Sequence, residues 1–331
     1  KMSPDTHPLV IAPLFWSHAQ APSFHRQAHA QRPLDVLNFI VHLQQETWGM
    51  PPDEVVPANL LAVLADTGGS LLVAYHPDAG FNADGWLGFA IALGSHQDTL
   101  VSHMLGVRAD ARGTQDIGWY LKVIQGYEAV RSGHSAAAWT FDPMRGVNAR
   151  LNLEKLGARA VELTINKYGA LRSDLYGHVP TDRLTARWDL LDPATWARLS
   201  AVASGAYSSP RLTDIADLPE ATPATIVDLR IRRPRRVRYR IPGDIDQLMR
   251  TDPATAIRWR HDMRTVLSAL LRTKSAQIGA EAIRDPLAVK VDDQPGEYVI
   301  NGFVTENEVP GERTSYYLLE RPPAPSDEDA S

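Results

Sequence analysis

Residues 105–118 have the composition of a loop that could hold a phosphate group. A run of strand-forming residues ends at Val107, a loop with Arg108 and Arg112 follows, and a helix is predicted to begin near Ile117. The first turn of a helix leaves backbone N–H groups unpaired at the positive end of the helix dipole, which suits a pyrophosphate. Either arginine could add a charge-assisted contact. An ordinary strand-to-helix turn is the alternative, and the loop alone does not decide between them.

The loop also excludes two common nucleotide-binding classes. It contains neither the GxxxxGK[ST] pattern nor the GxGxxG pattern. The sequence therefore argues against nucleoside triphosphate hydrolysis and against a dinucleotide-binding fold of the usual kind.

The composition of the chain excludes several other classes of protein. Of the 331 residues, 44% are hydrophobic and 22% are charged, which predicts a folded chain with a sizeable core. The formal net charge of -5 argues against a general nucleic-acid binder. The chain has no cysteine, which excludes thiol nucleophiles, cysteine zinc sites and disulfides. No apolar run has the length of a membrane span, so we expect a cytoplasmic protein that needs neither a membrane nor a metal ion.

Hydrophobic periodicity predicts the elements that position the loop. Apolar residues at helical spacing predict helices, and short apolar runs bounded by Gly, Asp or Pro predict strands. The predicted helices are 34–47, 59–65, 117–131 and 147–156, and the predicted strands are 70–75, 85–93, 99–107, 136–141 and 160–167. This order of elements predicts an α/β (α+β) fold in which the first three strands are antiparallel.

Two motifs in this framework resemble one superfamily. Val107, Arg112, Ile117 and Gly118 follow the spacing of a strand end and a glycine-containing loop, and residues 148–157 run from an Asn to a Lys-Leu-Gly helix end. Both patterns are similar to those of the GNAT superfamily of acyl-CoA-dependent N-acyltransferases. The resemblance implies a GNAT fold, which is a mixed central sheet flanked by helices, here with a C-terminal α+β extension.

A longer series of motifs resembles one subgroup of predicted GNAT acyltransferases, some of which are encoded beside N-acylamino acid racemases. The series extends over about residues 34–188. Its members in this chain are Trp48-Gly49, Pro57, Gly68-Gly69, Ser102-His103-Met104, Trp139 to Pro143, Asn148-Ala149, Lys155 to Gly157, Tyr176-Gly177 and Thr181 to Leu184.

The resemblance also implies a set of residues that bind acyl-CoA. They are Leu105, Gly106, Val107, Arg112, Gly113, Thr114, Gln115, Asp116, Ile117, Gly118, Asn148 and Asn152. The backbone amide near Leu105 would polarise the thioester carbonyl, and the pantetheine arm would extend the sheet as an added strand. The loop has one residue more than the superfamily pattern, and Asp116 stands where a Gly is usual.

The resemblance further implies catalytic candidates. His103 takes the position at which many members carry a catalytic Glu, and an imidazole ordinarily titrates near neutral pH. A histidine that is merely satisfied within a sheet is the alternative. Leu153 stands where many members carry the Tyr that protonates the leaving thiolate, so Tyr168 or Tyr176 is expected to supply the proton, with Tyr168 favoured.

Three further residues are candidates for binding the acceptor substrate. Trp139 and Asp142 end a strand beside the expected thioester, and Asp142 could hold an ammonium group or instead cap a helix. Arg183 could form a bidentate pair with a substrate carboxylate, or else a surface salt bridge. No set of metal ligands is expected.

The pattern changes after residue 190. Residues 191–225 have weak periodicity, which indicates a linker or an insertion. Residues 226–241 look extended, and their alternating arginines indicate a solvated strand face, with a CoA 3'-phosphate or RNA contact as the alternative. A helical stretch at 244–271 with a break at Asp252-Pro253 and a pair of strands at 298–304 and 314–319 complete the chain. The predicted domains are a GNAT acyltransferase domain at 1–190, a linker or insertion at 191–225, an α+β region at 226–321 and a disordered tail at 322–331.

Together these observations predict transfer of an acetyl or succinyl group from acetyl-CoA or succinyl-CoA to a small amine, plausibly an amino acid. By analogy with the family, the chain is expected to form a homodimer. The competing hypothesis is a non-catalytic protein that binds acyl-CoA and keeps the GNAT fold.

Overall fold

The computed structural model describes residues 9–14, 33–64, 68–76, 85–95, 98–169, 180–275, 296–309 and 312–322. The predicted tail after Pro322, most of the N-terminal segment and Tyr176 lie outside these residues. The chain forms two compact units. The first comprises Lys1–Trp139, Arg172–Gly177 and Asp189–Trp196, and the second comprises Thr140–Leu171, His178–Trp188 and Ala197–Ser331.

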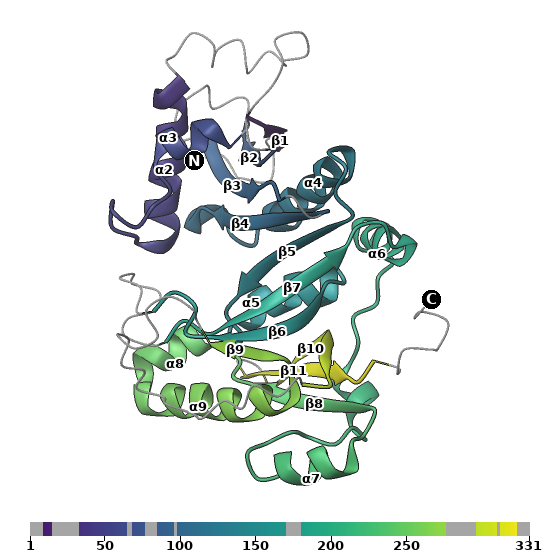
Figure 1. The fold of residues 1–331 in the computed structure, drawn as a ribbon. Coiled ribbons are helices and arrows are strands. Elements are labelled where there is room, and N and C mark those ends of the chain that lie inside the picture. Colours follow the sequence, from purple (N-terminus) through teal and green to yellow (C-terminus); the bar gives the residue numbers. More distant parts are fainter. Residues whose placement is uncertain are drawn as a thin grey trace. The chain divides into compact units, whose positions relative to one another are not determined.

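The first unit is a mixed sheet in the order β1-β2-β3-β4-β5 (Figure 1). Its strands are β1 (Val10–Pro13), β2 (Ser70–Tyr75), β3 (Trp86–Leu93), β4 (Thr99–Val107) and β5 (Ala136–Phe141), of which the last two residues belong to the second unit. Its helices are α2 (Pro33–Trp48), α3 (Ala58–Val63) and α4 (Ile117–Arg131). Neighbouring strands are antiparallel except for β4 and β5, which are parallel.

Helices cover both faces of this sheet. Ile40 of α2 and Leu61 of α3 pack with Phe89 on one face, and Leu121 of α4 packs with Leu72 on the other. Because both faces are covered, β2 and β3 are buried along nearly their whole length. This explains why they read in the sequence as continuous apolar runs rather than as alternating ones.

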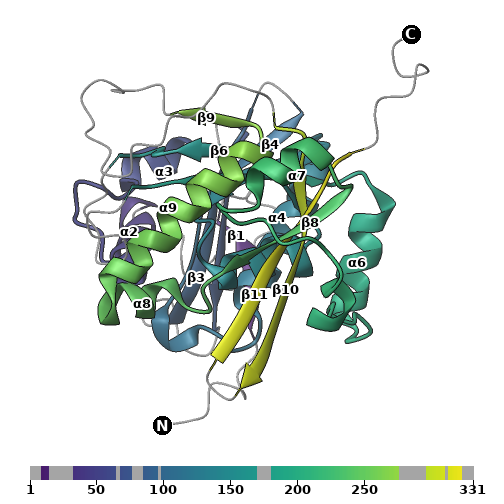
Figure 2. The ribbon, with the colours of Figure 1, turned by 90° about the horizontal axis from the view of Figure 1, so that it is seen from below.

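The second unit contains strands in the order β7-β6-β10-β11-β8, with β9 parallel to β6. Its strands are β6 (Arg159–Ile165), β7 (Arg183–Asp189), β8 (Arg236–Ile241), β9 (Thr273–Ser275), β10 (Val299–Val309) and β11 (Glu312–Glu320). Its helical elements are α5 (Gly146–Ala149), a π-helical stretch (Arg150–Lys155), α6 (Pro193–Ala203, which begins in the first unit), α7 (Ile226–Arg232), α8 (Ile245–Thr251) and α9 (Pro253–Leu270). Figure 2 shows β10 and β11 running side by side as a long antiparallel pair.

Most predicted elements are confirmed. The helix at 117–131 and the strands at 70–75, 99–107 and 136–141 have the predicted bounds. The break at Asp252-Pro253 is also confirmed, because the Asp252 carboxylate accepts a hydrogen bond from the N–H of Thr255 and Pro253 opens α9. The described residues therefore form the expected α/β fold with a mixed sheet flanked by helices.

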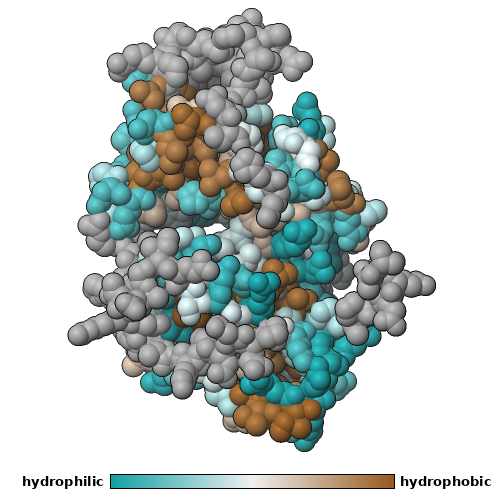
Figure 3. Space-filling model, viewed as in Figure 1, coloured by the Kyte–Doolittle hydropathy of each residue, from teal (hydrophilic) through white to brown (hydrophobic). Residues whose placement is uncertain are grey.

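The structure adds two elements to the prediction and corrects a third. Strand β1 lies before residue 34, where no element was predicted. Helix α6 lies within the predicted linker or insertion at 191–225, where alanines hide the helical period. Residues 226–232 form α7 rather than a strand, because Ile226 and Leu229 are one helical turn apart and both are buried. On α7, Val227 and Ile231 are exposed and contribute to an apolar patch that is visible in Figure 3.

The predicted solvated strand face is confirmed for β8. Val237, Tyr239 and Ile241 are buried, while the arginines between them are exposed or partly exposed. Several arginines of the run pair with acidic groups, among them Arg235 with Glu320. No helix in the part of the chain that the structure describes is long and apolar enough to cross a membrane.

Candidate functional site

A β-bulge interrupts β4 at His103. Ser102 lies opposite Ala92 of β3 and Met104 lies opposite Ile91, so that His103 is the extra residue of the bulge. A bulge of this kind bends the strand and changes the direction of the backbone groups around it. The side chain of His103 is exposed. The candidate base therefore occupies the point at which β4 changes course.

Strands β4 and β5 part at the same place. Their pairing joins Thr99–Val101 to Ala136–Ala138, and no pairing with β5 is found further along β4 among the described residues. Beyond Val101, this edge of β4 is not covered by β5. An unpaired strand edge can accept an extended ligand as an added strand through backbone hydrogen bonds.

The loop between β4 and α4 brings backbone N–H groups together. Gly113, Gln115 and Asp116 have φ angles of 76°, 49° and 47°, so three residues of a four-residue stretch adopt the left-handed conformation. Within the described part of the chain, the N–H groups of Gly113, Ile117 and Gly118 have no hydrogen-bond acceptor. Such N–H groups at a helix start form a concave anion-binding arrangement. Asp116 adopts a left-handed conformation that a Gly residue would take more readily.

The structure distinguishes the two arginines of the loop. Arg108 pairs with both carboxylate oxygens of Asp110, at 2.7 and 3.0 Å. Arg112 instead donates to the carbonyl oxygens of Val107 at 3.0 Å and Thr47 at 2.8 Å, and no carboxylate of the described residues lies within 4.0 Å of it. Carbonyl oxygens leave the guanidinium charge uncompensated, so Arg112 is the residue that provides a positive charge beside the loop.

Two glycines of the predicted acyl-CoA set differ in whether the surrounding packing leaves room for a side chain. A Cβ atom on Gly106 would lie 2.8 Å from the Phe89 ring, so Gly106 is required by packing inside the sheet. A Cβ atom on Gly118 would meet Leu105 and Val107 only at ordinary contact distances of 3.7 and 3.9 Å. The internal packing therefore does not require a glycine at position 118, which lies in the first turn of α4 beside the loop.

Lys122 is a buried residue of this region that the sequence analysis did not identify. Its Nζ atom donates to Ser102 Oγ at 2.6 Å and lies 3.7 Å from the centre of the Trp139 ring. A signal was present in the sequence, because Lys122, Gln125, Gly126 and Ala129 fall on one helical face, at spacings i, i+3, i+4 and i+7. All four are buried in α4.

Two predicted site residues meet in the second unit. The Arg183 guanidinium lies 5.5 Å from the centre of the Tyr168 ring. The ring is half exposed, and its hydroxyl lies 3.4 Å from Thr140 Oγ1. Arg183 itself is buried, which differs from a surface salt bridge.

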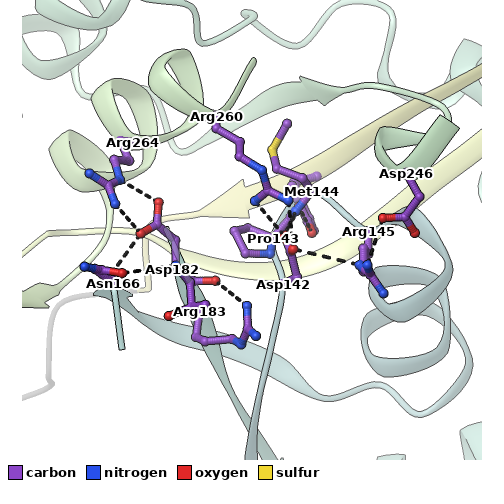
Figure 4. Close-up of polar contacts among 12 residues, drawn as sticks. Asp142, Pro143, Met144, Arg145, Asn166, Asp182, Arg183, Asp246, Arg260 and Arg264 are labelled. Carbon is purple, nitrogen blue, oxygen red and sulfur yellow. Dashed lines mark hydrogen bonds and ion pairs between the residues drawn. The ribbon is translucent and has the colours of Figure 1, made fainter. Parts of the chain in front are cut away.

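Asp142 is engaged inside the protein (Figure 4). Its carboxylate accepts two hydrogen bonds from Arg260, at 3.3 and 3.0 Å, and one from the N–H of Met144 at 2.8 Å. Burial alone would raise the pKa of Asp142, but the charges of Arg260, Arg183 and Arg145 outweigh it and lower the pKa to about 2. Asp142 is therefore held by an internal ion pair, and the N-cap residue of α5 is Arg145 rather than Asp142.

A second buried pair explains another of the sequence motifs. Asp182 accepts hydrogen bonds from Arg264 of α9 at 2.6 and 2.7 Å and from the N–H of Asn166 at 2.9 Å (Figure 4).

The two asparagines of the predicted acyl-CoA set lie in neighbouring helical elements. Asn148 lies in α5 and Asn152 is buried in the π-helical stretch that follows. Single π-helical turns are frequent at functional sites, and Asn152 lies in such a turn.

No protein-family model and no curated protein matched the sequence. Among solved structures, the fold is similar to that of three acetyltransferases, each with 55–56% of this chain covered. The ribosomal-protein-S18-alanine N-acetyltransferase of Escherichia coli is 14% identical, with 94% of that chain covered and a TM-score of 0.37. Aminoglycoside 6'-acetyltransferase type Ii is 14% identical, with 98% covered and a TM-score of 0.39. An acetyltransferase of Bacillus subtilis in complex with CoA is 13% identical, with 100% covered and a TM-score of 0.37. Because these TM-scores are below 0.5, an assignment of function depends on the residues of this chain.

Proposed function

We propose that this protein is an acyl-CoA-dependent N-acyltransferase with a GNAT fold. The observation that carries the proposal is the combination, along β4, of a bulge at His103, an edge that β5 leaves unpaired, and a left-handed loop that opens into α4. Each feature suits a different part of one ligand. The unpaired edge suits the pantetheine arm, and the loop suits the pyrophosphate.

In this proposal the loop binds the diphosphate group. The N–H groups of Gly113, Ile117 and Gly118 donate to its oxygens, and Arg112 contributes the positive charge. Gly106 and Val107 form the strand end that leads into the loop, and Thr114, Gln115 and Asp116 shape the loop itself. On the resemblance of the sequence motifs, Asn148 and Asn152 also belong to the proposed set for CoA.

The proposed reaction is a direct transfer. The amine of the acceptor attacks the thioester carbonyl, and the backbone N–H of Leu105 stabilises the negative charge that develops on the carbonyl oxygen. His103 takes the proton that the amine loses, the carbon–sulfur bond breaks, and Tyr168 protonates the CoA thiolate. The products are an amide and free CoA.

The sequence motifs that resemble the GNAT subgroup support a more specific proposal for the acceptor and the donor of the acyl group. A small amine such as an amino acid is the proposed acceptor, with Trp139 beside the thioester and Arg183 as the candidate partner of a carboxylate. Acetyl-CoA and succinyl-CoA are the proposed donors. On the same basis we propose that the chain is related to the racemase-associated subgroup. We also propose that it forms a homodimer and that it acts in the cytoplasm.

Calorimetric titration with CoA, acetyl-CoA and succinyl-CoA tests the proposal. Micromolar binding that Arg112→Ala weakens would support the loop assignment, and absence of binding to all three would overturn it. Release of free thiol from acetyl-CoA and succinyl-CoA is then measured with a panel of L- and D-amino acids and simple amines. A His103→Ala variant that binds CoA normally but loses turnover would support the assigned base.

A non-catalytic acyl-CoA-binding protein is the second candidate function. The observation that favours it is Leu153, which is buried and apolar where many superfamily members carry the proton-donating Tyr. Wild-type protein that binds CoA but releases no thiol with any amine of the panel would favour this candidate.

A further inference from the structure

Lys122 of α4 is a buried amine that has no counter-ion among the residues that the structure describes. It is 4% exposed, and no Asp or Glu oxygen of the described residues lies within 4.0 Å of its Nζ atom. Burial lowers the pKa of Lys122 to about 7. Removing an amine from water is unfavourable unless specific partners compensate for the lost hydration. The contacts of Lys122 are therefore informative about why an amine is present there.

Those contacts lie at the point where β4 and β5 part. Nζ donates to Ser102 Oγ at 2.6 Å, and Ser102 directly precedes the bulge residue His103. The same atom lies 3.7 Å from the centre of the Trp139 ring, and Trp139 directly follows Ala138, the last residue of β5 that pairs with β4. One side chain thus contacts both strands at the end of their pairing.

Packing alone does not require this amine. A methionine has similar length and would fill the same space without the cost of removing a charge from water. A Lys Nζ atom instead provides three donors with defined directions, of which one is used by Ser102 and one by Gln125 Oε1 at 3.3 Å. What the amine adds to packing is a directional bond to the strand beside its bulge.

We propose that Lys122 is a positioning residue that fixes the backbone of β4 at the His103 bulge. It acts through Ser102, and it does not touch the acyl group. The consequence for catalysis rests on the proposed function, in which the amide of Leu105, two residues beyond the bulge, stabilises the developing oxyanion. Such a donor is effective only when its position is fixed before the reaction.

Three variants test this proposal. Lys122→Met removes the amine and keeps the volume, and Ser102→Ala removes only the hydroxyl that the amine contacts. Arg131→Met is the matched control, because it removes a cation from the exposed end of the same helix. Hydrogen exchange of the amides in β2, β3 and β4 is measured without any ligand, together with the Kd for CoA and kcat on the best amine of the panel.

We expect faster exchange confined to residues 102–105, by about tenfold or more, in Lys122→Met and in Ser102→Ala. We expect kcat to fall by about 10- to 100-fold, with the Kd for CoA changed by less than about threefold. Arg131→Met should change none of these quantities. If Lys122→Met does not fold, Ser102→Ala provides the same comparison.

Unchanged exchange at residues 102–105 in both variants would overturn the proposal, and so would an equal increase across β2, β3 and β4. The proposed function can fail separately. If wild-type protein binds no CoA and releases no thiol, but exchange at the bulge still rises in the two variants, the acyltransferase assignment is wrong while the positioning of β4 by Lys122 stands.

Discussion

At the scale of single residues, the loop shows how neighbours decide the role of a charge. Arg108 and Arg112 are equivalent in the sequence, and either could contact an anion. In the structure, Asp110 neutralises Arg108, whereas Arg112 is held only by carbonyl oxygens. The positive charge available to a ligand therefore comes from Arg112.

This difference predicts unequal effects of two alanine substitutions. We expect Arg112→Ala to weaken CoA binding by about 1.5–3 kcal/mol, or roughly 10- to 100-fold, because a hydrogen-bonding cation is lost beside the diphosphate. Arg108→Ala should change the affinity by less than about threefold, since Asp110 already compensates that charge. Calorimetry at fixed ionic strength measures both. Equal losses for the two variants would contradict the roles assigned here.

Lys122 predicts a dependence of stability on pH. Its pKa is about 7 in the folded protein and 10.5 as the ordinary value, so the unfolded chain binds more protons between these limits. The free energy of unfolding should therefore rise with pH from about 7 to about 10.5 through this group. In Lys122→Met that contribution disappears, and the rise should be smaller. Urea denaturation at several pH values measures the two slopes, and parallel slopes would show that the amine is not desolvated in the folded state.

At the scale of elements, the start of α4 combines a loop geometry with an unfavourable charge. Asp116 adopts a left-handed φ of 47°, a conformation that Asn tolerates as well as Asp does. Asp116→Asn therefore keeps the backbone conformation and removes the negative charge. We expect CoA to bind a few-fold more tightly at low salt, with a smaller gain at high salt because surface charges are screened. Calorimetry at two salt concentrations tests this, and unchanged affinity would mean that the carboxylate does not face the diphosphate.

The same scale shows what the sequence could predict. Residues 117–131 have an apolar stripe and flanking glycines, and their helix was predicted with its observed bounds. The bulge at His103 could not be predicted, because it depends on the register between β3 and β4 rather than on the composition of either strand. The left-handed loop was also hidden, since Gln115 and Asp116 are not the glycines that normally indicate such a conformation. Helix α7 was missed because its arginines suggested a strand-like alternation.

At the scale of the whole molecule, α9 of the second unit is joined to the rest of that unit by two buried ion pairs. Arg260 reaches Asp142, which follows β5, and Arg264 reaches Asp182, which precedes β7. All four side chains are at most 3% exposed. The C-terminal part of the chain is thus bonded to residues of the GNAT-like motifs Trp139–Pro143 and Thr181–Leu184, although the sequence alone indicated no chemistry for it.

These pairs predict a large loss of stability when one partner is removed. Arg260→Met removes both guanidinium hydrogen bonds from the buried Asp142 carboxylate and leaves it the ion pair with Arg145, at 3.9 Å, so we expect unfolding to become easier by about 3–5 kcal/mol. The double variant Asp142→Asn with Arg260→Met should be less destabilised, because no unpaired charge remains.

The same pair predicts a dependence of stability on pH. Since the pKa of Asp142 is lowered to about 2, the pair stabilises the wild type above the ordinary pKa of 3.8 and loses that contribution as the pH falls from about 4 to about 2. Urea denaturation at pH 7 and across this acid range measures both effects. An additive double variant would show that the two side chains do not interact, and the role given to α9 in holding the second unit together would then be wrong.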